Sequence, residues 1–162
     1  MSSSAVVAHV STPLMGVSTG FRSFTPMAVT AWFARFGRLP LAGTWASWVG
    51  HPASVGLLTA LALGEYVGDK LPSAPARIAP VPLAGRVVLG GLVGAVLATA
   101  FRRKVWGGIA MGVAGALAGS YGGFALRREL THGAGLPDMP VALSGDVTAV
   151  AIAVRTLMRL TA

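Results

Sequence analysis

Four charged side chains lie inside stretches that are otherwise apolar: Arg22, Glu65, Asp69 and Asp146. Glu65 and Asp69 are four residues apart, so a helix turns both carboxylates to the same face. A charge at membrane depth is costly, and such residues usually face the interior of a helix bundle or a water-filled cavity. Carboxylates in that position can bind a cation or a proton, while an arginine can hold an anionic group or set the local field.

Two interpretations of these four residues follow from the sequence, and both stay open at this point. In the first, they form a polar intramembrane site, which predicts a transporter or channel for an ion or small solute. In the second, Arg22 pairs with Glu65 or Asp146 and locks the helices together. The chain would then be a non-transporting membrane scaffold or a lipid-interacting protein.

The composition predicts a membrane protein with the lipid bilayer as its main partner. Of the 162 residues, 54% are hydrophobic and only 11% are charged, whereas an ordinary soluble domain has about 25% charged residues. A chain of this length cannot bury so much apolar surface by itself, so lipid must cover it. The net charge of +8 comes from basic residues that lie mostly between apolar runs. Topology signals and headgroup contacts occupy such positions, so we expect no nucleic-acid partner.

We predict an all-α fold, a polytopic transmembrane helix bundle in which residues 1–162 form a single integral membrane domain. It has about five spans, over residues 10–36, 52–70, 83–100, 105–126 and 139–160. The first span is interrupted, since Pro26 removes a backbone donor and tends to kink or break a helix. A broken helix at membrane depth is tolerated where it lines a cavity or packs inside protein. The loop over residues 71–82 is rich in proline and should be extended.

Small residues recur at regular spacing in the third and fourth predicted spans. The glycines concerned are Gly90, Gly94, Gly108, Gly112, Gly115, Gly119 and Gly123. Such stripes form grooves that let a second helix approach closely. They predict tight packing within the chain, and they also predict a homo-oligomer that associates through the same glycine-rich faces.

Five spans place the two termini on opposite sides of the membrane. With the N-terminus outside, seven basic residues are cytoplasmic, against five on the other side. The seven are Arg35, Arg38, Arg102, Arg103, Lys104, Arg155 and Arg159. This bias favours an N-terminus outside and a cytoplasmic C-terminus.

An internal similarity makes an inverted repeat a candidate feature of the bundle. Gly16–Phe21 opens the first span and Gly119–Phe124 closes the fourth, with a similar glycine and phenylalanine pattern. Each is followed by a loop and a span that carries an aspartate, Asp69 or Asp146. The first two and the last two spans would then be related as in many transporters.

Several kinds of chemistry have no support in the sequence. The chain has no cysteine, which excludes disulfides and thiolate metal sites. His9, His51 and His132 lie in separate segments, and no serine, histidine and aspartate have the spacing of a catalytic triad. We therefore expect no enzymatic activity, no cofactor and no metal.

The chain resembles the domain of unknown function 4126 family of uncharacterised bacterial membrane proteins. The matching pieces are Gly20–Met27, Ala34–Gly37, Glu65–Pro72 and Leu143–Val147, of which the Glu-x-x-x-Asp-Lys-x-Pro piece is the most specific. Family members tend to carry an acidic residue before the final aspartate, and this chain has Gly145 there. The resemblance implies a multi-pass protein of the bacterial inner (cytoplasmic) membrane and names no substrate.

Overall fold

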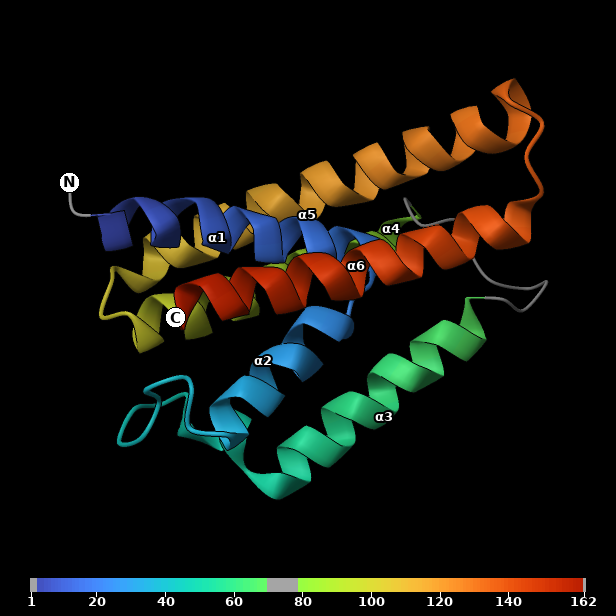
Figure 1. Ribbon diagram of the computed structural model, residues 1–162. Helices are drawn as coiled ribbons and strands as arrows, with labels where there is room; N and C mark the ends of the chain where they lie inside the picture. The colour runs from blue at the N-terminus through green and yellow to red at the C-terminus, as the bar shows by residue number, and fades with distance from the viewer. Residues whose placement is uncertain (1–2, 70–78, 162) are drawn as a thin grey trace.

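The computed structural model describes residues 3–69 and 79–161, and these residues form a helical bundle (Figure 1). The α-helices are α1 (Ser3–Phe21), α2 (Thr25–Arg35), α3 (Pro52–Gly68), α4 (Pro80–Ala100), α5 (Val105–Arg128) and α6 (Asp138–Leu160). A 3-10 turn, η1 (Ser47–Gly50), precedes α3, and a π-helical turn, η2 (Glu129–Gly133), follows α5. No strand occurs among the described residues, so the all-α fold is confirmed there.

Three of the described helices are long and apolar enough to cross a membrane. They are α4, α6 and the continuous helix formed by α5 and η2 over Val105–Gly133. Their length matches the roughly 20 residues that a bilayer requires. The other two predicted spans, 10–36 and 52–70, correspond to α1, α2 and α3. The predicted end at Lys70 and most of the proline-rich loop lie outside the described residues.

The first predicted span is two helices that run in different directions, not one interrupted helix. The chain turns back between Phe21 and Thr25 (Figure 1). Before the turn, α1 packs antiparallel to α6, and Ser18 Oγ donates a hydrogen bond to the Ala149 carbonyl at 2.7 Å. After it, α2 packs antiparallel to α3, and Trp32 Nε1 donates to Thr59 Oγ1 at 3.1 Å. The broken helix predicted around Pro26 is real, but the break is a reversal.

This reversal corrects the prediction that the two termini lie on opposite sides. Because segment 10–36 supplies two helices, both ends of the described chain lie at the same end of the bundle (Figure 1). Thr12 of α1 and Leu160 of α6 line one cavity together with Arg102 of the α4–α5 turn. Both ends lie at the same end of the bundle because the extra helix adds one change of direction to the chain.

The predicted glycine stripes pack helices against each other within the chain. α4 and α5 are antiparallel, and a Cβ added at Gly94 would lie 2.1 Å from the Gly108 carbonyl oxygen. α1 and α5 also meet at backbone distance, and a Cβ at Gly115 would lie 2.2 Å from the Pro13 carbonyl oxygen. Only glycine permits such approaches. The faces are thus occupied inside one chain, and association of copies through them stays a prediction.

The candidate inverted repeat does not hold in this bundle. It requires α1 and α5 to run in opposite directions across the membrane. Pro13 and Gly16 meet Gly115, whereas Phe21 meets Gly123, so residue numbers rise together along the two helices. α1 and α5 are therefore parallel, as Figure 1 also shows.

The α3 helix lies at the edge of the bundle (Figure 1). Its main contacts are with α2 and η1. Leu57, Leu61 and Leu63 are exposed on it, as lipid-facing residues are. Of its described residues, Val55, Leu58 and Ala62 are buried and belong to the hydrophobic core. The helix that carries Glu65 and Asp69 is therefore less firmly packed than the rest.

Candidate functional site

Arg22 is the centre of the site, because its guanidinium joins three helices. It lies in the turn after α1, where its backbone N–H still bonds to the Ser18 carbonyl at 2.9 Å. The residue is 1% exposed. Its Nε donates to Asp146 Oδ1 of α6 at 2.7 Å, and Nη2 donates to the same oxygen. Nη1 donates to Asp69 Oδ2 at the end of α3. One buried cation therefore holds two carboxylates.

Glu65 has a different role, because its carboxylate binds the backbone at the start of α2. Its two oxygens accept hydrogen bonds from the Ser23 N–H at 2.7 Å and from the Phe24 N–H at 3.0 Å. The N-cap residue of α2 makes no side-chain cap of its own. A carboxylate there satisfies free N–H groups and interacts favourably with the positive end of the helix dipole. Of the two predicted partners of Arg22, Asp146 is confirmed, whereas Glu65 binds the backbone and Asp69 is the second partner of Arg22.

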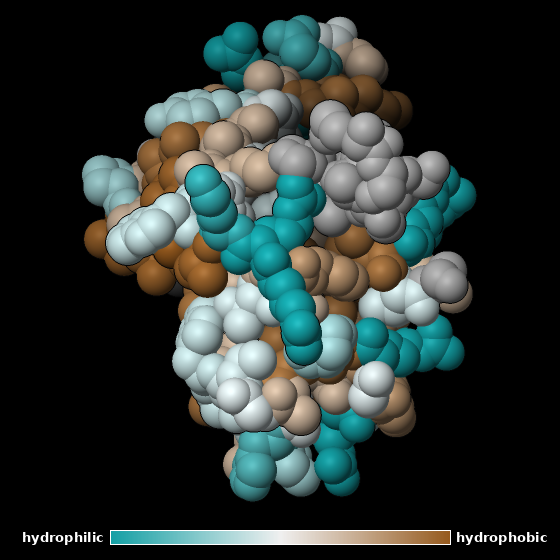
Figure 2. All heavy atoms as spheres, turned by 90° about the vertical axis from the view of Figure 1, so that its left-hand side faces the viewer, coloured by the Kyte–Doolittle hydropathy of each residue, from teal (hydrophilic) through white to brown (hydrophobic). Residues whose placement is uncertain are grey.

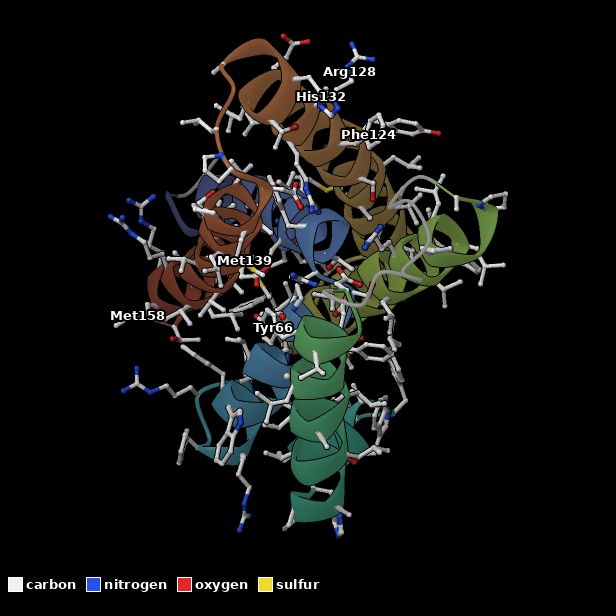
Figure 3. All side chains as sticks on the ribbon, turned by 90° about the vertical axis from the view of Figure 1, so that its right-hand side faces the viewer. Tyr66, Phe124, Arg128, His132, Met139 and Met158 are labelled. Atoms are coloured by element: carbon white, nitrogen blue, oxygen red, sulfur yellow. The ribbon has the colours of Figure 1, made fainter. Side chains whose placement is uncertain are left out.

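Tyr66 completes the site from α3 and was not selected from the sequence. The Arg22 guanidinium carbon lies 4.9 Å from the centre of the Tyr66 ring, which is a cation–π distance. The Tyr66 hydroxyl is 2.8 Å from the Thr25 Oγ1 atom at the start of α2. Figure 3 shows Tyr66 where the end of α3 reaches the rest of the bundle. Its only sequence signal is its position next to Glu65.

Arg86 is a second buried cation near the site, and it was not selected from the sequence. It lies in α4, is 2% exposed, and is reached by the fields of Glu65 and Asp69. An arginine within the apolar run 83–100 is the signal that could have identified it. The cluster of described residues then contains three carboxylates and two guanidinium groups. Its formal charge is −1 when all five are ionised.

The site borders a groove on the flank of the molecule. This groove, of about 570 Å³, lies between Tyr66 of α3 and the α6 residues Asp146, Val147, Val150 and Val154. Asp146 itself is 8% exposed, whereas the Asp69 side chain is 31% exposed. Asp69 thus lies at the edge of the cluster, whereas Asp146 and Arg22 are buried inside it.

The remaining candidates do not form a site of their own. The described residues contain no group of three or more histidine or acidic side chains arranged to hold a metal ion. His51 accepts a hydrogen bond from the Ala53 N–H before α3, and His132 contacts Thr131 after α5. The selected glycines serve helix packing, as described above.

Three long apolar helices and a buried ion cluster define the class of this protein as a helical bundle with helices suited to cross a membrane. The chain belongs to the family of the domain of unknown function DUF4126, whose model matches residues 12–159. The match confirms the resemblance seen in the sequence and includes all five charged residues of the cluster. No curated protein and no solved structure matched the chain.

Proposed function

We propose that this protein is a small transporter or channel that moves a monovalent cation or a proton through the cluster of Arg22, Glu65, Asp69, Arg86 and Asp146. The observation that carries the proposal is a cluster of charged side chains among apolar helices, in which Arg22, Arg86 and Asp146 are buried and Glu65 and Asp69 are half-buried. One bound cation or proton makes the cluster neutral. Intramembrane carboxylates in such an environment are typical of ion and proton pathways.

The break between α1 and α2 supports the same proposal. Discontinuous helices in transporters place free backbone groups and helix ends at the substrate site. Here the turn brings Arg22 and the start of α2 to the carboxylates of α3. Such a turn is tolerated at membrane depth when it is packed inside protein.

The pairing of Arg22 suggests how passage is controlled. The Asp69 side chain is 31% exposed, against 11% for that of Asp146, and the two share the Arg22 guanidinium. A cation or proton that arrives at Asp69 competes with Arg22 for its oxygens. Release of this bond frees the end of α3, whose packing is confined mainly to α2 and η1. In the paired state the cluster is closed, and exchange of partners opens it.

One observation favours a second function, that of a scaffold in which the cluster is only a lock. Arg22 is directly bonded to both aspartates, which is the geometry expected of a permanent tie between α1, α3 and α6. In that case the same charges fix the arrangement of the helices, and no solute crosses.

The site of action is proposed to be the bacterial inner membrane. Seven basic residues, and none of the five acidic ones, lie toward the end of the bundle that carries the α4–α5 turn. The positive-inside rule assigns that end to the cytoplasm. Both termini are then cytoplasmic, which replaces the orientation predicted from five spans.

Flux measurements on the full chain in liposomes test the transport proposal. A pH-sensitive dye inside the vesicles reports proton movement, and potassium and sodium gradients test the two cations. We expect Asp69→Asn and Asp146→Asn to reduce the flux at least tenfold. Glu129→Gln, whose side chain is 70% exposed, is the matched control and should leave it unchanged.

The same experiment separates the two functions. If the wild-type protein dissipates no gradient while both aspartate variants unfold more easily in detergent, the cluster is a lock. If both variants keep full flux, the carboxylates are not the pathway and the transport proposal fails.

A further inference from the structure

The α4–α5 turn carries a basic cavity that the polar cluster does not explain. It has a volume of about 470 Å³ and lies at the other end of the bundle from Asp69. Arg102, Arg103 and Lys104 line it, and apolar side chains, including Leu97, Met111 and Leu160, line its other walls. A pocket with basic and apolar walls suits a ligand that has an anionic head and a hydrocarbon tail.

The backbone conformation of Arg102 is unusual for a residue other than glycine. Arg102 has φ +51°, in the left-handed region. Its N–H bonds to the Thr99 carbonyl, and the next N–H bonds to the Ala98 carbonyl, as in the Schellman motif that ends many helices. Glycine usually occupies this position because a Cβ atom is strained there. Glycine would therefore stabilise the turn at the position that Arg102 occupies.

The start of α5 adds hydrogen-bond donors to the same cavity. The first bond of this helix runs from the Gly108 N–H to the Lys104 carbonyl, and no side chain caps its N-terminus. Gly107 and Gly108 both line the cavity, and a Cβ at Gly107 would meet no atom within 4 Å. Backbone N–H groups at a helix N-terminus bind phosphate when basic side chains stand beside them.

The surroundings of the cavity match the headgroup region of a membrane. Trp106 in the first turn of α5 is 82% exposed, as is typical of residues at the level of lipid headgroups. Figure 2 views this end of the molecule and shows long hydrophilic side chains beside hydrophobic patches. All five acidic residues of the chain lie toward the opposite end or in the polar cluster. The charged side chains that line the cavity are therefore all basic.

We infer that this cavity binds an anionic phospholipid, with its phosphate at Arg102, Arg103, Lys104 and the start of α5 and its acyl chains along Leu97, Met111 and Leu160. A negatively charged headgroup is complementary in charge to the three basic side chains, and the apolar wall suits the acyl chains. A zwitterionic lipid offers the same tail but no net negative charge. The site thus selects lipids by charge, independently of whether the polar cluster conducts.

Native mass spectrometry of the delipidated full chain tests this inference. The probes are phosphatidylglycerol, phosphatidylcholine and inorganic phosphate, each titrated separately. We expect phosphatidylglycerol to bind at least tenfold more tightly than phosphatidylcholine. Arg102→Gly should weaken phosphatidylglycerol binding about fivefold, and a double variant Arg103→Gln/Lys104→Gln about 25-fold, because each basic residue near a membrane surface contributes about a fivefold factor.

Controls distinguish loss of the site from loss of the fold. Arg128→Gln removes an exposed charge at the far end of α5 and should leave lipid binding unchanged. Arg102→Gly should unfold no earlier than the wild type, so a weaker affinity cannot be due to unfolding.

Three results would overturn the inference. The first is unchanged phosphatidylglycerol binding in both variants, and the second is an equal loss in Arg128→Gln. In the third, inorganic phosphate alone binds as tightly as the lipid, which assigns the cavity to a free phosphate group.

Discussion

Replacement of Arg22 by methionine is the sharpest test of the buried ion cluster. Methionine keeps a long side chain in the centre of the bundle but carries no charge. Asp69 and Asp146 therefore lose the cation that they share. Loss of one partner from a buried ion pair costs about 3–5 kcal/mol, because a charge remains in a place that water does not reach. The Asp69 side chain is 31% exposed and is partly screened, whereas that of Asp146 is 11% exposed. We therefore expect a loss of about 3 kcal/mol in the free energy of unfolding, most of it from Asp146.

Equilibrium unfolding of the full chain in mixed micelles measures this loss. The matched control is Arg127→Met, which breaks the pair of Arg127 with Asp138, whose side chain is 63% exposed. Exposed pairs contribute at most about 1 kcal/mol, so the control should change little. If both variants lose the same free energy, burial does not set the strength of the Arg22 cluster and the reasoning is refuted.

A triple variant identifies the source of the loss. Arg22→Met combined with Asp69→Asn and Asp146→Asn removes the cation together with both charges that it held. Replacement of a complete buried ion pair by neutral groups is often nearly neutral for stability. The triple variant should therefore regain most of the stability that Arg22→Met loses. A triple variant as unstable as the single one would show that lost packing, not unpaired charge, is the cause.

Three further predictions concern the backbone. Gly112→Ala should cost about 1–3 kcal/mol of unfolding free energy. The reason is that its Cβ would lie 2.1 Å from the Gly90 carbonyl oxygen. In the same unfolding assay, Gly107→Ala should be neutral or slightly stabilising, because a Cβ there would lie in open space. Arg102→Gly should raise the unfolding free energy by about 1 kcal/mol through relief of its left-handed backbone, and an unchanged or lower value would contradict this. Glu65→Ala should lower the free energy of unfolding by about 0.5–2 kcal/mol and speed hydrogen exchange of the Ser23 and Phe24 amides. Unchanged protection of these two amides would show that Glu65 does not hold the start of α2.

The local properties of the chain were predictable from the sequence. Long apolar runs with few charges predicted α4, α5 and α6, and the structure confirms them as helices long enough to cross a membrane. Prolines and glycines predicted a break near Pro26, and α2 indeed begins at Thr25. The four selected charges do lie together, because a charge in an apolar segment can be stabilised only by other polar groups.

The tertiary structure alone decided the direction of the chain at that break. Local signals stop a helix at Arg22 but do not say where the next one points. The direction is set by two contacts between residues far apart in the sequence. Glu65 binds the Phe24 N–H at the start of α2, 41 residues away, and Asp146 binds Arg22, 124 residues away. The reversal moved the N-terminus to the other end of the bundle and made α1 and α5 parallel. Hydropathy measures the length of apolar segments and not their direction. The prediction of five spans therefore could not include the reversal between α1 and α2.

The choice of partners was likewise beyond the sequence. The sequence predicted that Arg22 is a buried cation. The structure shows that Arg22 binds Asp69 and Asp146, whereas Glu65 accepts hydrogen bonds from the backbone. The burial of Arg86 in α4 was likewise decided by the packing of the bundle. Sequence thus determined which residues must avoid lipid, since that depends on the free energy of each side chain in hydrocarbon. Which of them meet depends on helix packing, and close packing is a property of the whole bundle.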